Sequence, residues 1–263
     1  MPLAGSRARG RVFTVALVGG DGAGKTTIAR SLEKSSPLPS RYVYLGPSTL
    51  SSNAPLPTTR LVRFLKLRAY SRTVEKSGNS QPLTPSSHDL HYASARPGLI
   101  WATARFANRL AEAWWRQLLS LRYRLQGYIV VYDRHYLFES APGLPKSKRQ
   151  DQKLMDRLEF WMMSHLYPKP DLVIFLDAPP QVLYDRKAEA TLKYLEERRG
   201  ATLEQGKKMP HFVRVDAAQP LEEVLADVAQ HIQDFYASRN SNKTRDGYSR
   251  LQPPEERRDR RRN

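Results

Sequence analysis

Cysteine is absent from this chain of 263 residues. Its absence excludes a disulfide framework, a zinc or iron–sulfur site with cysteine ligands, and a cysteine nucleophile. Long apolar runs are absent as well, since none approaches the roughly 20 residues that a membrane span requires. The short apolar run at 12–18 is followed by a glycine-rich loop and not by a signal-peptide cleavage site. We therefore expect a cytoplasmic protein.

Negative charge is scarce. The sequence has 26 Asp and Glu residues against 43 Lys and Arg residues, which gives a net charge of +17. Such an excess favours partners that carry phosphate, whether nucleotides, nucleic acid or an acidic membrane. The net charge alone does not distinguish between these classes of partner.

Short apolar segments rich in β-branched residues alternate with segments of helical period along most of the chain. This alternation predicts an α/β fold, with a parallel sheet that is covered by helices on both faces. The expected strands lie at 12–18, 42–45, 128–132, 172–176 and 212–215, and the expected helices at 26–34, 99–125, 182–199 and 221–236.

The rest of the chain falls outside this pattern. We expect a disordered lead at 1–10 and a basic disordered tail at 239–263, because charged segments without apolar residues cannot bury enough surface to fold. Residues 47–97 are expected to form an insertion in the domain 11–238 that is partly disordered or lid-like. The basic insertion and tail could contact nucleic acid or an anionic membrane, or could simply be solvated.

A phosphate-binding motif follows the first expected strand. Residues 19–26 read Gly-Gly-Asp-Gly-Ala-Gly-Lys-Thr and fit the pattern G-x-x-x-x-G-K-[ST]. The glycines let backbone N–H groups turn towards a phosphate, and the following helix presents the positive end of its dipole to the same anion. Lys25 is expected to bridge the β- and γ-phosphates, and the Thr26 hydroxyl to ligate Mg²⁺. We assign to this site Gly19, Gly20, Asp21, Gly22, Ala23, Gly24, Lys25, Thr26 and Thr27.

The motif predicts binding of a nucleoside triphosphate but is shared by motor ATPases, GTPases and small-molecule kinases. A second segment favours a kinase, because the third expected strand ends in Asp133-Arg134. The carboxyl ends of parallel strands line the ligand crevice. Asp133 could therefore hold the Mg²⁺ shell, and Arg134 could bind an acceptor phosphate through two hydrogen bonds. The alternative is that the two residues form only an ion pair at the surface.

Two further segments add arginines and an aromatic side chain. Arg186, with Arg198 or Arg199 behind it, could form a helical lid that neutralises a migrating phosphoryl group, or could belong to a solvated helix. Trp101 and Arg105 are four residues apart on an expected helix and share a face. The tryptophan could stack on a base while the arginine reaches a phosphate, or it could belong to the core.

These segments resemble, in the same order along the chain, those of thymidylate kinases and related P-loop nucleoside-monophosphate kinases. The resemblance covers roughly 12–46 and 98–236. It implies the three-layer fold of P-loop NTPases, a five-stranded parallel sheet with helices on both faces and a helical lid. It also implies transfer of the γ-phosphoryl group of Mg²⁺·ATP to dTMP without a covalent intermediate, and commonly a homodimer formed through the helix near 101–121.

The resemblance assigns roles to the acceptor side. It implies that Asp21 faces the acceptor sugar or phosphate and that Trp101 stacks on thymine. Arg105 and Arg134 would clamp the acceptor phosphate.

The resemblance also assigns the donor side. Lys25 and Arg186 would act on the transferred phosphoryl group, with Asp133 at the metal. The phosphate loop has no arginine of its own, and in such members of the family the lid supplies one. The residues expected beside the adenine of ATP are Ala218 and Gln219.

Two departures from the family lie on the acceptor side. The chain has no aromatic-Gln pair in 137–143, and it has Gly46-Pro47 followed by the insertion where the family has an arginine-containing loop. The acceptor therefore stays open. The first expectation is a dTMP kinase, and the alternatives are a P-loop kinase with another small-molecule acceptor, or a nucleotide-binding protein whose basic segments bind nucleic acid or membrane.

Overall fold

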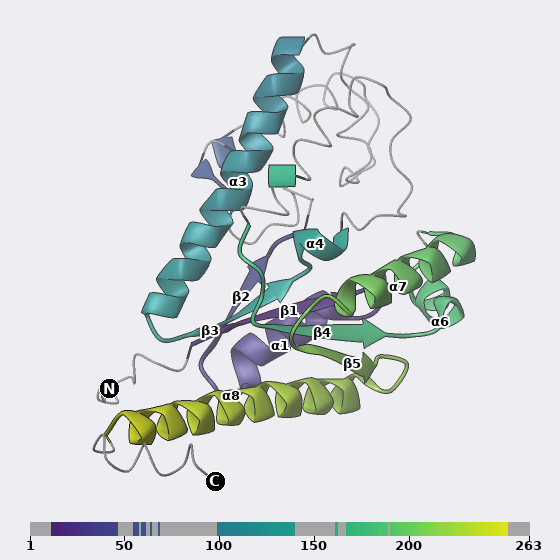
Figure 1. Cartoon of the computed structure of the whole chain (residues 1–263). Coiled ribbons are helices and arrows are strands. Elements are labelled where there is room, and N and C mark those ends of the chain that lie inside the picture. Colours follow the sequence, from purple (N-terminus) through teal and green to yellow (C-terminus); the bar gives the residue numbers. More distant parts are fainter. Residues whose placement is uncertain are drawn as a thin grey trace.

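A five-stranded, all-parallel sheet lies at the centre of the computed structural model, in the order β2-β3-β1-β4-β5 (Figure 1). This confirms the predicted α/β fold. The strands are β1 (Thr14–Gly19), β2 (Ser40–Tyr44), β3 (Ile129–Asp133), β4 (Leu172–Asp177) and β5 (Phe212–Asp216). The structure describes residues 12–46, 55–57, 59–61, 64, 68, 99–139, 161–162, 167–188 and 190–251.

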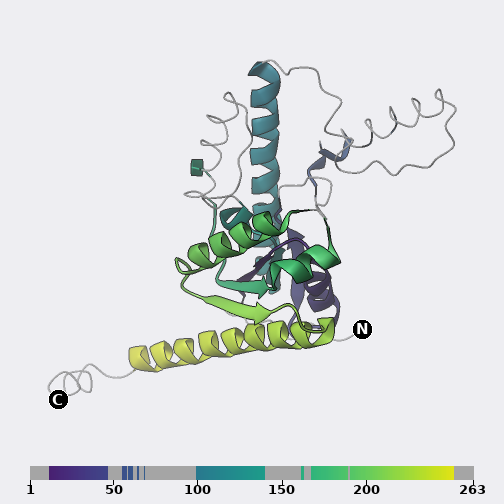
Figure 2. The ribbon, with the colours of Figure 1, turned by 90° about the vertical axis from the view of Figure 1, so that its right-hand side faces the viewer.

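Helices cover both faces of the sheet. α1 (Lys25–Ser35) and α8 (Leu221–Leu251) lie on one side, and α3 (Leu99–Leu125) lies on the other and extends beyond the sheet (Figures 1 and 2). The short α4 (Tyr136–Glu139) follows β3. α6 (Pro180–Arg186) and α7 (Leu192–Gly206) follow the carboxyl end of β4.

The central strands are buried because both of their faces are covered. In β1, the side chains of Val15 and Leu17 pack in the cluster that includes α1 and α8, while those of Ala16 and Val18 pack in the cluster beneath α3. Strands of this kind read as continuous apolar runs and not as an alternating pattern, which explains why the sequence identified them.

The helices differ from the sequence prediction in two places. The helix expected at 182–199 is two helices, because Thr191 begins α7 by accepting a hydrogen bond from the Tyr194 backbone N–H at 3.3 Å. The last helix continues to Leu251, past the boundary placed at 238, and the residues after it lie outside the described part of the chain, as do 1–11 and most of the insertion. Among the described residues, no helix has both the length and the apolar character needed to cross a membrane.

A buried histidine follows the end of β3. His135 is 0% exposed, and its ring lies between Tyr132 and Tyr167, with centroids 6.0 and 5.6 Å away. The Leu137 backbone N–H donates to Nδ1 at 3.4 Å, so Nε2 carries the proton and donates to the Pro168 carbonyl oxygen at 3.3 Å. Burial lowers the pKa of His135 to about 4. The neutral ring is therefore part of the native packing.

This histidine predicts an acid-sensitive fold. Between pH 6.5 and about 4 the unfolded chain binds a proton at His135 that the folded chain does not bind. The free energy of unfolding should therefore fall with decreasing pH, by up to about 1.4 kcal/mol per pH unit from this group. Urea denaturation at pH 7, 6 and 5 measures this slope, and His135→Gln should reduce it. Equal slopes for H135Q and the wild type would contradict the prediction.

Candidate active site

The parallel register brings the functional loops to one edge of the sheet. β1 lies between β3 and β4, with Leu17 paired with Asp133 and Gly19 paired with Leu176. The phosphate loop after Gly19 therefore begins beside the carboxyl ends of both neighbouring strands. This edge is where open α/β sheets bind ligands.

The phosphate loop has the backbone of an anion site. Gly22 and Gly24 have φ angles of 92° and 83°, in the left-handed region that favours glycine. A Cβ on Gly22 would lie 2.9 Å from the carbonyl oxygen of Leu183, so that position also lacks room for a side chain. Gly24 begins α1 without a side chain that could accept from the first N–H groups of the helix. Those donors and the helix dipole are thus available to a phosphate.

Lys25 is buried against this loop. Its Nζ donates to the carbonyl oxygens of Gly19 at 2.9 Å and Gly20 at 2.6 Å. Burial lowers its pKa to about 8, and the nearby positive charge of Arg134 acts in the same direction. A buried cation that is held mainly by backbone carbonyls fits a site for a strongly negative ligand.

Thr26 and Asp133 meet at the start of α1. The Thr26 hydroxyl donates to Asp133 Oδ2 at 2.5 Å, and the Tyr42 hydroxyl donates to the same oxygen at 3.3 Å. Asp133 is 0% exposed, and its Oδ1 is buried without a hydrogen-bond partner among the described residues. A buried carboxylate oxygen without a partner, beside a hydroxyl, fits the hard oxygen ligands that Mg²⁺ prefers.

The metal site would depend on more than protein ligands. Within the described ranges, no group of three or more His, Asp or Glu side chains could hold a metal ion. Mg²⁺ commonly uses one or two carboxylates together with substrate phosphates and water. The Thr26–Asp133 pair beside the phosphate loop fits that mode.

A chain of four charged side chains starts at the phosphate loop. Arg134 Nη2 donates to Asp21 Oδ1 at 2.5 Å, and its Nη1 donates to Glu139 Oε1 at 3.3 Å. Arg198 Nη2 donates to Glu139 Oε2 at 2.6 Å. Burial opposes ionisation of Asp21, but Arg134 outweighs it and lowers the pKa of Asp21 below its usual value. Arg134 has a φ of 71°, a left-handed conformation that is uncommon outside glycine and frequent at functional sites.

The other arginines that were expected in a lid lie elsewhere. Arg186 donates to the carbonyl oxygens of Ala217 at 2.7 Å and Ala218 at 3.3 Å, next to the segment expected to contact adenine. Arg199 donates twice to Asp177, at 2.7 and 3.0 Å. The structure therefore brings Arg198, and neither of these two arginines, into the chain of charges that contains Arg134.

α3 contacts the end of β2 through residues that sequence reasoning did not identify. Arg116 Nη1 donates to the Gly46 carbonyl oxygen at 2.9 Å, and Glu112 Oε2 accepts from the Leu56 N–H at 3.0 Å. Trp101 and Arg105 lie in the first turns of α3, and their side chains are outside the described residues. At 1.5 Å per residue they precede Arg116 by about 22 and 16 Å along the helix axis.

Glu139 is the other residue that sequence reasoning missed as a site residue. Its segment was recognised only as a departure from the family pattern. The signal that could have found it is its spacing, since a carboxylate five residues after Arg134 can return to that arginine through one turn of helix.

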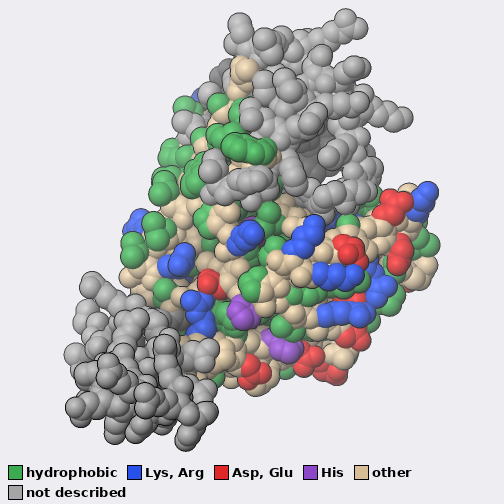
Figure 3. Space-filling view, in the orientation of Figure 1, with side chains coloured by type: hydrophobic (Ala, Val, Ile, Leu, Met, Phe, Trp, Pro, Cys, Tyr) green, Lys and Arg blue, Asp and Glu red, His purple; other side chains and the backbone are tan. Residues whose placement is uncertain are grey.

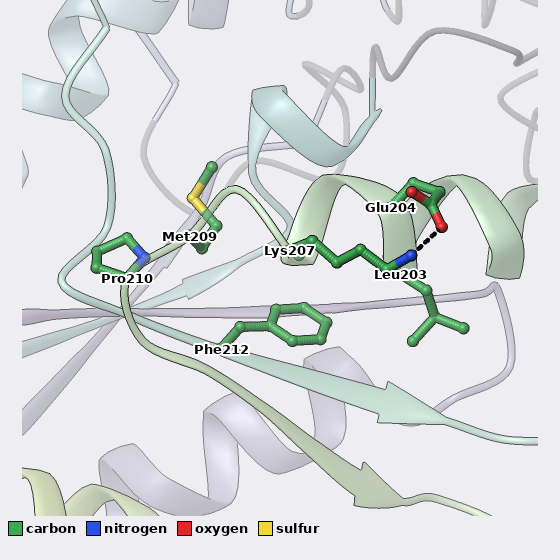
Figure 4. A pocket seen from close by; sticks show the side chains of 7 residues that line it. Leu203, Glu204, Lys207, Met209, Pro210 and Phe212 are labelled. Carbon is green, nitrogen blue, oxygen red and sulfur yellow. Dashed lines mark hydrogen bonds and ion pairs between the residues drawn. The ribbon is translucent and has the colours of Figure 1, made fainter.

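A hollow of about 490 Å³ lies away from these residues (Figure 4). Met209, Pro210 and Phe212 line it at the connection from α7 to β5, and Lys207 and Glu204 form an ion pair of 2.5 Å at the same place. Phe212 begins β5, so the hollow lies at the opposite end of that strand from Asp216 and the ligand edge. It is not the phosphate site.

Two known proteins that resemble this chain do so over different lengths. "Probable thymidylate kinase" of Archaeoglobus fulgidus is 34% identical over 128 residues, which cover 44% of this chain and 59% of that protein. The chain thus spans less than two thirds of that relative. "Uncharacterized ATP-binding protein YghS" of Escherichia coli is 27% identical over 233 residues, which cover 81% of this chain and 90% of that protein. No protein-family model matches the sequence. The similarities suggest a P-loop, kinase-like family.

The geometry at Asp133 predicts the effect of removing its charge. We expect Asp133→Asn to fold and to bind metal-free ATP at least as well as the wild type. It should lose the gain in ATP affinity that Mg²⁺ gives, by about tenfold or more, because a neutral amide is a weak ligand for this ion. Calorimetric titration of ATP with and without Mg²⁺ measures both affinities. Asp185→Asn, at an exposed carboxylate of α6, is the matched control. An undiminished Mg²⁺ effect in D133N would contradict the assignment.

Proposed function

We propose that this protein is an ATP-dependent kinase that transfers the γ-phosphoryl group of Mg²⁺·ATP to a nucleoside monophosphate, with dTMP as the first candidate. The observation that carries the proposal is the group formed by Lys25, Thr26 and Asp133, with Arg134 one residue beyond the metal-binding candidate. It combines a triphosphate site with a cation beside the place where an acceptor phosphate must approach. The names of both similar proteins support ATP as the donor.

The donor side of the proposal rests on three kinds of contact. The loop N–H groups and Lys25 bind the β- and γ-phosphates, while Thr26 and Asp133 hold Mg²⁺. When bound, Mg²⁺ neutralises charge on the phosphate oxygens. Arg186, through its contacts to Ala217 and Ala218, brings the adenine side close to the phosphate loop. Phosphoryl transfer asks the protein mainly for positioning and charge neutralisation, and these residues supply both.

The acceptor side rests partly on the resemblance. Arg134 and Asp21 form an ion pair in the described site and are assigned to the acceptor. Trp101 and Arg105 keep the roles that the resemblance implies, stacking on the base and binding its phosphate. The name of the Archaeoglobus protein favours dTMP. The altered segment after Arg134 and the contact from Arg116 to Gly46 favour the alternative of a different small-molecule acceptor.

A third candidate is a nucleotide-binding protein with a macromolecular partner. The observation in its favour is the basic composition of 239–263, with nine Lys and Arg residues against four Asp and Glu residues. Salt-sensitive binding to DNA or to anionic vesicles that is lost on deletion of this segment would support it.

The proposed activity predicts turnover restricted to a few acceptors. ADP release should be measured with Mg²⁺·ATP and dTMP, dUMP, dCMP, dGMP, AMP, UMP and several sugar phosphates. Turnover with dTMP and dUMP alone is the expected result, and Lys25→Ala should reduce it by about 100-fold or more. ATP binding without turnover on any nucleotide would overturn the nucleoside-monophosphate assignment.

An exposed apolar stripe supports a homodimer as part of the proposal. Trp114, Leu118, Leu121 and Leu125 are spaced at helical intervals on α3, and Leu118 and Leu125 are 59% and 77% exposed. Hydrophobic side chains gather along this helix in the space-filling view (Figure 3). Such stripes commonly mark protein–protein contacts.

The stripe predicts the effect of a charge in its middle. Leu118→Arg should convert a dimer to a monomer, because burying an unpaired guanidinium in an apolar interface is unfavourable. Light scattering after size-exclusion chromatography measures the mass, and ATP affinity should stay unchanged. A wild-type protein that is monomeric at 100 µM would contradict the homodimer.

A further inference from the structure

Glu139 joins two arginines that come from different parts of the fold. One carboxylate oxygen accepts from Arg134 at 3.3 Å and the other from Arg198 at 2.6 Å. Arg134 follows β3, whereas Arg198 lies 64 positions later in α7. The side chain of Glu139 is 12% exposed and that of Arg198 is 8% exposed. The junction is therefore largely shielded from solvent, where charge-assisted hydrogen bonds are strong.

Glu139 and Arg198 are each held in place by neighbours in their own element. The N–H groups of Phe138 and Glu139 both donate to the His135 carbonyl oxygen, at 2.9 and 3.1 Å, and Phe138 is buried in the core. On α7, Arg198 Nη1 donates to the Tyr194 hydroxyl at 3.3 Å. Because Glu139 and Arg198 are both held in place, the Glu139 carboxylate sets the separation between the guanidinium groups of Arg134 and Arg198.

The charges of the four linked side chains balance. Asp21 and Glu139 carry one negative charge each, and Arg134 and Arg198 carry one positive charge each. Both terminal nitrogens of Arg134 donate to carboxylates, and Arg198 directs one to Glu139 and the other to Tyr194. A phosphate that uses these guanidinium groups must therefore exchange with a carboxylate.

The ligand that would draw Arg198 away from Glu139 follows from the neighbours of Glu139. Asp21 lies within the phosphate loop, and the Lys25 ammonium, which binds the β- and γ-phosphates in such loops, experiences the charges of Arg134, Asp21 and Glu139. Hydrogen bonds from Asp21 through Arg134 and Glu139 connect Arg198 to the phosphate loop, and a guanidinium so placed can bind the oxygens of a terminal phosphoryl group.

We propose that Glu139 is a positioning residue that holds Arg198 beside Arg134, and releases Arg198 to the γ-phosphoryl group when ATP binds. This proposal rests on the proposed function, because it requires ATP to bind at the phosphate loop. Without ATP, the carboxylate holds Arg198 in this orientation. In return, it competes with ATP for Arg198.

The test compares ATP with ADP, which lacks the γ-phosphoryl group. Glu139→Gln keeps the shape of the side chain and removes its charge, so we expect ATP to bind about tenfold more tightly while ADP affinity stays unchanged. Glu139→Asp keeps the charge and should restore the wild-type ratio of ATP to ADP affinity. Glu204→Gln, at a 70% exposed carboxylate of α7, is the matched control and should change neither affinity.

The outcomes separate this proposal from the proposed function. If the wild type does not bind ATP, the proposed function fails. If the wild type binds ATP and E139Q alters ATP and ADP affinity equally, or not at all, Glu139 is only a structural bridge and this proposal is overturned. Should E139Q not fold, as judged by thermal melting, Arg198→Gln carries the test. It should weaken ATP but not ADP, and an equal loss for both nucleotides would overturn the proposal.

Discussion

The position of β1 between β3 and β4 is the constraint on which the candidate site depends. Parallel pairing places Leu17 beside Asp133, so the loop that follows β1 must open next to the polar residues that end β3. The 2.5 Å hydrogen bond from Thr26 to Asp133 then ties the first turn of α1 to that strand end. Loop, helix and carboxylate are thus held by the sheet, whose strands are buried on both faces.

Charge compensation governs the rest of the site. A loop of backbone donors with a buried Lys25 attracts anions, and carboxylates lie near it. Asp21 and Glu139 neutralise Arg134 and Arg198, and Asp177 neutralises Arg199. A protein with a large positive net charge therefore presents a locally balanced site, in which carboxylates hold the arginines in place.

The sequence predicted the backbone of the phosphate loop better than the contacts of α3, for a physical reason. The phosphate loop is a contiguous segment in which the local backbone conformation determines the residue type. Gly22 and Gly24, for example, have a left-handed backbone that favours glycine. The contacts of α3 join separate segments, and the hydrogen bond from Arg116 to Gly46 joins residues 70 positions apart. Short motifs do not show which residue of a long helix will contact a distant segment. Arg116 was missed for this reason.

The sequence by itself determined the α/β fold, the strands and the phosphate loop, because apolar period and glycine requirements act over a few neighbouring residues. It also singled out Arg186, Arg198 and Arg199. Only the tertiary structure decided their partners: Arg186 donates to the carbonyl oxygen of Ala217, Arg199 donates to Asp177, and Arg198 donates to Glu139. All three carry the same charge within one short stretch, so their roles depend on the partner that the fold brings to each, and that partner lies far away in the chain.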